Sequence, residues 1–428
     1  MIRFILAGIA LGAAHLDPRL SLLAWIGAGA LPWALQGARG FCPALGLLLG
    51  GMVAHSLALH WFLLTALSYQ DTRPPLPAVL AVALAGWSTC ALMVWGPAAL
   101  AAIICRRVSP SLWLPAAMAI GEALRAALTG FSQDDYLCSQ WRIEQILRCL
   151  AHIGWTPTLL LLLCACTSLG EAITRRSGWR ALPASVVLIM LGALPGRVPS
   201  KPSPDIGAVV AAASAESGMV PPPSASSHIR LLIWPEGAFS DRIPGIEEGP
   251  LLPLCWPGLP FGREHLLGAL TRSQAGLQNS VLHVGPDGCI DAARAKSTLA
   301  PVGERRFAGL GPLGEKFVPG RRVPLIQAAG RKIIPLLCIE VFDRALVALG
   351  RRHGGDMIAV LASDLAYADS EIAIRQSLAA LALRSAEAGL PSVRASLGGV
   401  AAFIDAGGHV LCSSMSAMGD VLTCDGGI

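Results

Sequence analysis

The sequence has little charge, and the patterns that are missing exclude several classes of protein. Charged residues make up only 14% of its 428 residues, whereas hydrophobic residues make up 54%. A nucleic-acid-binding surface would need a basic stripe interleaved with aromatic residues, and the sequence has none, so we expect no direct nucleic-acid partner. The modest net charge of +5 comes mainly from arginines that lie between apolar runs.

The twelve cysteines follow none of the spacings that mark a metal site. There is no Cys-x-x-Cys pair and no Cys/His cluster with zinc spacing, so we expect no structural metal and no cofactor. Seven cysteines lie in or beside apolar runs, where cysteine acts as a small apolar residue. We therefore expect no disulfide framework. The seven are Cys42, Cys90, Cys105, Cys138, Cys149, Cys164 and Cys166.

Acidic residues are scarce before residue 197, and this divides the chain into two parts. Almost no Asp or Glu interrupts the apolar runs of residues 1–197, whereas the remainder has the composition of a soluble domain. A helix needs about 20 apolar residues to span a membrane. We therefore predict a polytopic α-helical membrane bundle of about seven helices over residues 1–197. The apolar runs occupy residues 2–16, 20–36, 41–67, 76–104, 109–130, 152–170 and 181–196.

Arginine placement predicts how this bundle is oriented, because cytoplasmic loops carry an excess of basic residues. With a cytoplasmic N-terminus, the inner loops contain Arg39, then Arg106 and Arg107, then the cluster at 175–180. An odd number of spans puts the part after residue 197 outside the cytoplasm. A bundle with one span fewer would reverse this side.

Polar residues inside the apolar runs are costly, so each needs an explanation. Glu122 and Arg125 are three residues apart and therefore share one helical face. They are interpreted as a neutralising pair inside the bundle, or alternatively as a contact to a lipid headgroup or substrate. His55 is interpreted as a packing or interfacial residue. Gly46 and Gly50 form a Gly-x-x-x-Gly pattern, which predicts close helix packing.

The second part has the alternation of an α/β domain. Residues 198–228 are rich in Pro, Ser, Ala and Gly and are predicted to be a linker that includes a first strand at 206–210. Short β-type runs then alternate with helical stretches over residues 229–428, which indicates buried sheets. Strands are expected at 229–234, 279–284, 333–338, 357–362 and 399–404, and helices near 262–276 and 370–388.

Three reactive side chains lie at or near the ends of these strands and could form one site. Trp234-Pro235-Glu236 supplies a carboxylate, Lys296 an amine and Cys338 a thiol. A thiol becomes a nucleophile when another group takes its proton, and Glu236 could be that base. Lys296 would favour the thiolate and stabilise an oxyanion. Taken together they predict acyl transfer through a thioester, although each residue alone is also compatible with a structural role.

The motifs around these residues resemble those of the carbon–nitrogen hydrolase (nitrilase) superfamily. Trp234-Pro235-Glu236, the stretch from Lys296 to Glu304, and Leu337-Cys338-Ile339-Glu340 match its three motifs. The resemblance implies a nitrilase-type αββα sandwich in which Glu236, Lys296 and Cys338 form a catalytic triad. It also implies supporting roles for Glu304 and Glu340.

The whole layout is similar to the apolipoprotein N-acyltransferase family, in which such a domain lies on the outer side of a multi-span bundle. Glu122-Ala123-Leu124-Arg125 with the following Gly130-Phe131 resembles a helix of that family. The chain departs from the family in its short segment before Trp234, in the lack of a final apolar run, and at residues 362–368, where a tryptophan is missing. In its size, its seven-span start and its missing final helix it resembles the TraB family of conjugal transfer proteins encoded on plasmids.

The resemblance implies a multi-pass acyltransferase of a bacterial inner membrane, with its catalytic domain on the periplasmic side, in lipoprotein biosynthesis or in a plasmid conjugal transfer system. Cys338 would take an acyl group from a phospholipid and pass it to an amine of a protein or lipoprotein acceptor. Two alternatives stay open. A membrane-tethered amidase would transfer the acyl group to water, and a non-catalytic conjugation or pilus assembly factor would keep the fold as a scaffold.

Overall fold

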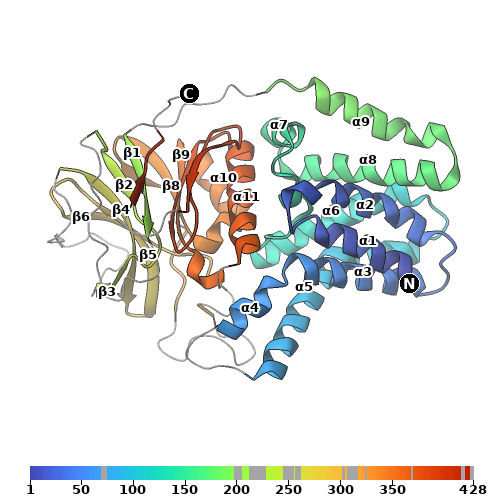
Figure 1. Cartoon of the computed structure of the whole chain (residues 1–428), viewed down its shortest axis with the longest axis horizontal. Helices are drawn as coiled ribbons and strands as arrows, with labels where there is room; N and C mark the ends of the chain where they lie inside the picture. Colours follow the sequence, from blue (N-terminus) through green and yellow to red (C-terminus); the bar gives the residue numbers. More distant parts are fainter. Residues whose placement is uncertain are drawn as a thin grey trace. The chain divides into compact units, whose positions relative to one another are not determined.

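The computed structural model divides the chain into two compact units, Met1–Arg197 and Val198–Ile428. The first unit is helical, and the second is built on paired β-strands (Figure 1). Most of the expected linker, residues 198–228, lies outside the described residues. The structure describes residues 1–68, 75–196, 205–211, 228–243, 255, 262–300, 304–305, 317–322, 325–367, 370–415 and 420–424.

Helices occupy all seven apolar runs of the first unit, and the run at 41–67 is divided into two helices at Leu59 and His60. Among the described residues, α5 and α8 are long and apolar enough to cross a membrane, and α1 and α3 are apolar but shorter. The helices are α1 (Ile2–Ala13), α2 (Leu22–Leu35), α3 (Cys42–Ala58), α4 (Trp61–Ser68), α5 (Leu76–Ile104), α6 (Pro110–Thr129), α7 (Glu144–Ile153), α8 (Trp155–Arg175) and α9 (Leu182–Ala193).

Glycines allow helices of the first unit to approach each other closely. A Cβ at Gly46 would lie 2.3 Å from the ring of Phe4, and one at Gly50 would lie 2.7 Å from the carbonyl oxygen of Phe4. The predicted Gly-x-x-x-Gly contact is therefore confirmed and joins α3 to α1. Between α2 and α8 the approach is closer still, since a Cβ at Gly170 would lie 1.8 Å from the carbonyl oxygen of Gly29.

The second unit is built on strands paired in the order β6-β5-β4-β2-β1-β10-β9-β8-β7. The strands β4, β2, β1, β10, β9 and β8 pair in parallel in the middle of this path, and antiparallel pairs lie at its two ends. The strands are β1 (Ile206–Ala211), β2 (Leu231–Ile233), β3 (Phe239–Ile243), β4 (Glu264–Ser273), β5 (Gly276–Val284), β6 (Ile290–Ala295), β7 (Ile326–Ala328), β8 (Arg331–Leu337), β9 (Met357–Ser363), β10 (Ser392–Leu397), β11 (Ala401–Ile404), β12 (Val410–Ser414) and β13 (Asp420–Leu422).

The two halves of this strand path share one buried core. Leu231, Leu266 and Val281 from β2, β4 and β5 belong to the same cluster as Ile333 and Leu361 from β8 and β9. All five are fully buried. Strands that are buried on both faces read as continuous apolar runs, which is why the sequence located β2, β5, β8 and β9. The first strand expected at 206–210 is also confirmed, as β1.

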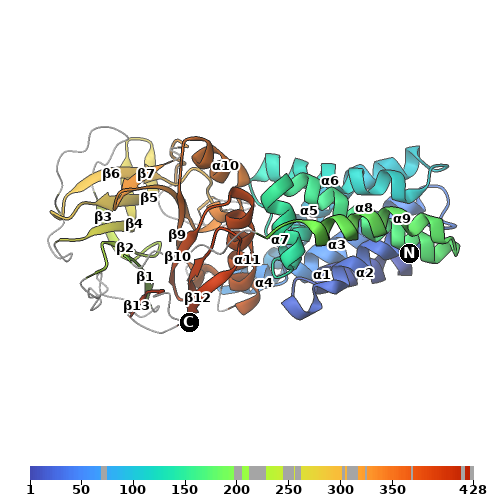
Figure 2. The same ribbon diagram turned by 90° about the horizontal axis from the view of Figure 1, so that it is seen from above.

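The helical cover differs from the expected αββα sandwich. Helices α10 (Arg344–Arg352) and α11 (Glu371–Ala388) lie beside the β8–β10 half (Figure 2). The contact with β8 is close, because a Cβ at Gly350 of α10 would lie 2.6 Å from the side chain of Ile334. Within the described residues of this unit there is no other α-helix, so one of the two expected helical layers is present there.

The helix expected near residues 262–276 is wrong, because Glu264–Ser273 forms β4. This strand pairs antiparallel with β5 along its whole length. Intrinsic helix propensity differs by less than about 1 kcal/mol among ordinary residues and is overridden by such tertiary pairing. In this strand Gly268 allows the backbone of Glu236 to pack closely against β4, since a Cβ at Gly268 would lie 2.6 Å from the Cα atom of Glu236.

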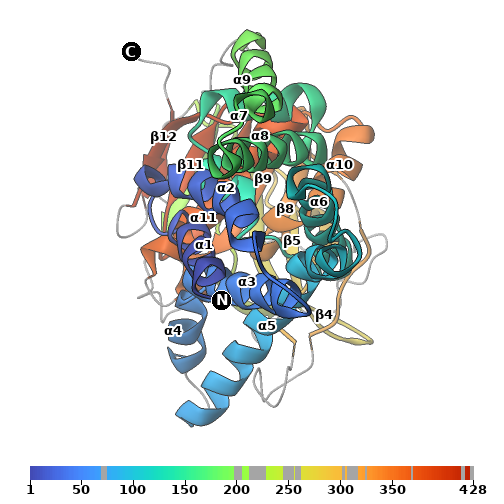
Figure 3. The same cartoon turned by 90° about the vertical axis from the view of Figure 1, so that its right-hand side faces the viewer.

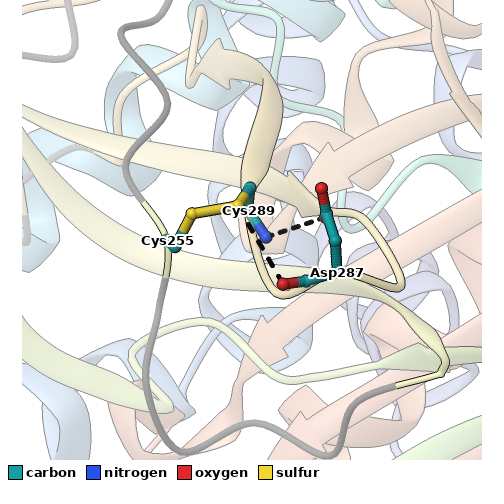
Figure 4. The surroundings of a disulfide bond; sticks show 3 residues. All are labelled: Cys255, Asp287 and Cys289. Atoms are coloured by element: carbon teal, nitrogen blue, oxygen red, sulfur yellow. Dashed lines mark hydrogen bonds between the residues drawn. A yellow bond between two sulfur atoms is a disulfide. The ribbon is translucent and has the colours of Figure 1, made fainter.

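Disulfide bonds join four cysteines of the second unit, so the expectation of no disulfide framework is wrong for this unit. The pairs are Cys255–Cys289 and Cys412–Cys424. The first pair ties residue 255 to the turn between β5 and β6, where the backbone N–H of Cys289 donates to Asp287 Oδ1 at 3.0 Å (Figure 4). Its partners are 34 residues apart, so local spacing gave no sign that they meet.

We predict that replacing both Cys255 and Cys289 with serine lowers the unfolding free energy of the second unit by about 3–4 kcal/mol. The reason is that the bond closes a loop of 34 residues in the unfolded chain. Thermal unfolding of the purified full chain should show a melting temperature lower by several degrees. Cys42→Ser, at an exposed free cysteine of the first unit, is the control. Equal melting temperatures for the double variant and wild type would contradict the pairing.

Candidate active site

The first candidate residue, Glu236, lies just beyond the end of β2. Trp234 is fully buried, and its backbone N–H donates to the carbonyl oxygen of Leu266 at 2.8 Å. Pro235 follows and has no N–H to continue the ladder. The chain therefore leaves the sheet at this point, and the carboxylate of Glu236 is held at the strand end with the residue only 8% exposed.

Lys296 follows β6 and meets two carboxylates. Its ammonium donates to Glu236 Oε1 and to Glu304 Oε1, both at 3.0 Å. Its backbone N–H donates to the carbonyl oxygen of Asn279 at 2.7 Å, which fixes the lysine against β5. With Lys296 only 2% exposed, the structure brings three of the sequence-predicted residues into one buried cluster.

Asn279 completes this cluster and was not recognised from the sequence. Its amide Nδ2 donates to Glu236 Oε1 and, at 2.9 Å, to Glu304 Oε1. Glu304 also accepts the backbone N–H of Ala300 at 2.7 Å. Asn279 is the first residue of the predicted strand 279–284, and no motif marks it. The only signal in the sequence was therefore a polar amide next to an apolar run. It places a neutral donor between two carboxylates, which reduces their repulsion.

Cys338 follows β8 in a strained backbone conformation. Its φ angle is +45°, in the left-handed region that non-glycine residues rarely adopt. Such a conformation costs on the order of 1–3 kcal/mol and persists where surrounding contacts impose it. Here it turns the chain from the strand into a short 3-10 helix, Cys338–Phe342, and leaves the cysteine partly exposed.

Glu340 supplies the contacts that hold this turn. The carboxylate is fully buried and accepts both guanidinium NH groups of Arg294, with the bond to Oε1 at 2.7 Å. It also accepts the backbone N–H of Leu337 at 3.0 Å, just before the cysteine. On the other side it accepts the backbone N–H groups of Ser297 and Thr298 at 2.7 and 3.2 Å, just after the lysine. One carboxylate therefore links the cysteine turn to the lysine segment.

The electrostatics of the cluster keep the lysine charged and the thiol neutral. Burial alone would lower the pKa of Lys296, but Glu236 and Glu304 outweigh it and raise the pKa above its usual value. Burial raises the pKa of the Cys338 thiol, and Glu236 raises it further, whereas Lys296 lowers it. Lys296 thus acts on the thiol in the expected direction, although burial and Glu236 together outweigh it and leave the thiol pKa raised.

Glu236 is suited to remove that proton. Burial raises its pKa above that of an ordinary glutamate, whereas Lys296 and the amide of Asn279 act in the opposite direction. A base with a raised pKa binds a proton more readily. The cluster can therefore take the thiol proton at the moment of attack and offer a fixed ammonium to a developing negative charge.

A buried ion pair occupies the region where the family's tryptophan is missing. Asp364, directly after β9, accepts two N–H groups of Arg394 at 2.6 and 2.9 Å. It also accepts the hydroxyl of Ser396 at 2.6 Å. Asp364 is close enough to contribute to the raised pKa of Cys338. The sequence did not predict this pair, because its partners lie on different strands.

The pair Glu122 and Arg125 lies in the first unit and takes no part in this cluster. Arg125 donates to Glu122 Oε2 at 2.7 Å and also to Asp134, which in turn contacts His55. All four side chains are buried. The structure thus pairs the two residues inside the helical unit, with Asp134 and His55 as partners that the sequence did not reveal. No cluster of metal-ligating side chains occurs among the described residues.

Comparison with known proteins finds a partial relative. No protein-family model matches the chain. An apolipoprotein N-acyltransferase of Rhodopseudomonas palustris is 30% identical over 210 residues, which cover 43% of this chain and 37% of that protein. The chain thus matches well under half of that relative's length.

Two solved structures overlap with part of the chain. A carbon–nitrogen hydrolase of Helicobacter pylori is 14% identical, with a TM-score of 0.32, over 38% of this chain and 61% of that one. An amidase of a Nesterenkonia species, solved with butyramide, is 16% identical, with a TM-score of 0.28, over 36% and 57%. Both TM-scores lie below 0.5, so these overlaps carry no argument about this chain.

We predict that Glu236→Gln speeds alkylation of Cys338 several-fold at neutral pH. The Glu236 carboxylate raises the thiol pKa, so its neutral replacement increases the thiolate fraction that reacts. The rate of iodoacetamide modification of the peptide containing Cys338, followed by mass spectrometry between about pH 6 and pH 10, measures this shift.

The control for this measurement is Glu371→Gln, which removes one carboxylate from the exposed start of α11 and should leave the alkylation rate unchanged. An alkylation rate in Glu236→Gln equal to that of wild type across this pH range would contradict the electrostatic coupling between the two groups, whereas a slower reaction would show that Glu236 takes the thiol proton during attack.

Proposed function

We propose that the protein is a membrane-bound acyltransferase of the carbon–nitrogen hydrolase superfamily, with Glu236, Lys296 and Cys338 as its catalytic triad. The observation that carries the proposal is the buried contact of Lys296 with Glu236 and Glu304 beside a cysteine on a strained turn. Buried charged groups are costly unless paired, and this cluster joins a base, a cation and a nucleophile.

The first half-reaction forms a thioester. The sulfur of Cys338 attacks the ester carbonyl carbon of a phospholipid while Glu236 takes the thiol proton. Lys296, held charged by its two carboxylates, stabilises the oxyanion of the tetrahedral intermediate. Collapse of this intermediate breaks the ester bond, and the proton on Glu236 passes to the departing lysophospholipid alkoxide.

The second half-reaction transfers the acyl group to an amine of a protein or lipoprotein. The amine attacks the thioester carbonyl, Glu236 accepts the amine proton, and the C–S bond breaks. The departing thiolate then takes this proton from Glu236, which restores the neutral thiol and the free carboxylate. The raised pKa of Glu236 suits a group that must both take and return a proton.

The surface of the first unit supports its location in a membrane. Besides the two long apolar helices α5 and α8, this unit has nearly all the exposed large hydrophobic side chains of the described residues. Such surfaces are rare on soluble monomers and mark contact with lipid or protein. In the second unit the corresponding set is small and consists of Leu365, Leu411 and Met415.

Arginine placement and disulfides support a periplasmic location for the second unit. Arg39, Arg106 and Arg175 line one cavity, at the end of the first unit where α8 finishes. The chain leaves this unit at the other end, where the carbonyl oxygen of Leu194 accepts a hydrogen bond from Arg148 of α7. An arginine-rich cytoplasmic end would leave the chain that follows Leu194 on the periplasmic side, and the two disulfides of the second unit are typical of an oxidising compartment.

The acceptor is proposed more narrowly from the resemblance to the TraB family. It would be a protein of a plasmid conjugal transfer system, modified at the outer face of the inner membrane. The departure at residues 362–368, where a tryptophan is missing, supports an acceptor unlike that of the apolipoprotein N-acyltransferase family.

We predict that purified protein incubated with an alkyne-tagged phospholipid becomes labelled at Cys338. The label should be released by hydroxylamine, because a thioester is cleaved by that nucleophile, and it should be absent in Cys338→Ala. Lys296→Met should reduce labelling by at least about 100-fold if its ammonium stabilises the oxyanion. Cys42→Ser, which changes an exposed cysteine of the first unit, is the matched control and should label as wild type does.

Each outcome decides between the proposed reactions. A thioester that persists until an amine acceptor is added supports acyl transfer. Rapid release of free fatty acid in water, without an acceptor, would favour a membrane-tethered amidase or hydrolase instead. Absence of label in a folded protein that retains its biological activity would favour the non-catalytic assembly factor.

A further inference from the structure

A second site is suggested by the arginine-rich end of the first unit, which faces the viewer in Figure 3. A cavity of about 460 Å³ lies there between the α2–α3 loop, the α5–α6 loop and the end of α8. Arg39 comes from the first of these loops, Arg106 and Arg107 from the second, and Arg175 from α8. None of the candidate catalytic residues lines it.

The acidic residue of this cavity is already neutralised. Glu171 is 2% exposed and accepts hydrogen bonds from Arg180 at 2.5 Å, from Arg175 at 2.8 Å and from the hydroxyl of Ser111 at 2.6 Å. Within the described part of the chain, no ion pair joins an acidic side chain to the three arginines of the two loops, Arg39, Arg106 and Arg107. The cavity therefore has an excess of positive charge.

An apolar groove lies next to this cavity. It has a volume of about 690 Å³, runs between α2 and α8, and shares Gln36 and Thr174 with the basic cavity. Gly29 and Gly170, at which the backbones of α2 and α8 touch, line the groove without side chains that would fill it. Larger apolar side chains on both helices complete its walls, among them Ile26, Leu169 and Ile173.

We propose that this cavity and groove form a binding site for one anionic phospholipid, with its phosphate among the loop arginines and an acyl chain between α2 and α8. Guanidinium groups bind phosphate oxygens in pairs, and clusters of arginine at a membrane surface attract anionic lipids. Phe41, Ile104 and Leu112 are more than 70% exposed at the same end, where they would contact the surrounding lipid.

This site differs from the acyl-donor site that the proposed reaction requires. It lies at the end of the helical unit opposite to the point where the chain leaves for the second unit. A lipid bound there would hold the arginine loops in place and would not be consumed. The inference rests on the membrane location proposed above and is independent of the acyl-transfer reaction.

The test is native mass spectrometry of the full chain in detergent, in the Cys338→Ala background so that no acyl transfer occurs. Titration with phosphatidylglycerol should give one tightly bound lipid, and phosphatidylcholine should bind at least about tenfold more weakly. Arg106→Gln/Arg107→Gln should lower phosphatidylglycerol affinity at least about tenfold. The matched control is Arg19→Gln/Arg142→Gln, which removes the same charge from loops at the other end and should change affinity less than about twofold.

A second variant distinguishes binding of a phospholipid from binding of a free anion. Ala30→Trp fills the apolar groove and should weaken phosphatidylglycerol binding while leaving the basic cavity intact. If inorganic phosphate displaces the lipid fully and Ala30→Trp has no effect, the cavity takes free phosphate and the lipid assignment is overturned. Equal losses of phosphatidylglycerol affinity in the two double arginine variants would overturn it as well. Binding of the lipid would then depend only on the total charge of the protein. Neither result bears on thioester formation at Cys338.

Discussion

The candidate active site depends on one buried ion pair, between Arg294 of β6 and Glu340 of the turn after β8. Both residues are fully buried. Burial alone would raise the pKa of Glu340, but Arg294 and backbone donors lower it, so the carboxylate stays ionised. Its contribution to stability is present above the pKa of an unfolded glutamate, about 4.3, and is lost as the pH falls through the lowered folded pKa. Because the same carboxylate accepts the N–H groups of Leu337 and Ser297, it sets the position of the nucleophile relative to the lysine.

That constraint explains how the site can combine groups that would otherwise repel or neutralise one another. Glu236 and Glu304 are held together by Lys296 and Asn279, which keeps a fixed cation and a base at one point. The thiol of Cys338 stays protonated at rest because burial and Glu236 raise its pKa. In the proposed mechanism, activation would be coupled to the arrival of a substrate, whose carbonyl would accept the electron pair while Glu236 accepts the proton. A neutral resting thiol is also less susceptible to oxidation than a thiolate.

The sequence predicted the parts of this architecture that depend on local patterns and missed those that depend on distant contacts. Apolar runs located β2, β5, β8 and β9, and three motifs located Glu236, Lys296 and Cys338. The residues of β4 favour a helix because they have good helix propensity, and the pairing of this strand with β5 is not visible locally. Asn279, Arg294 and Asp364 were missed for the same reason, since each acquires its role from a partner on another strand. Cys255 and Cys289 likewise meet only in the folded unit.

The most direct test of this account is a double-mutant cycle of unfolding free energy on Arg294→Met and Glu340→Leu, combined with labelling of Cys338 by an acyl donor. Each single variant should lose about 3–5 kcal/mol because it leaves a buried charge unpaired. The double variant should recover most of that stability, since two apolar side chains can replace the pair, yet it should label Cys338 far more slowly than wild type. If the double variant labels at the wild-type rate, the pair is dispensable for positioning, and the account of how the site is held together is contradicted.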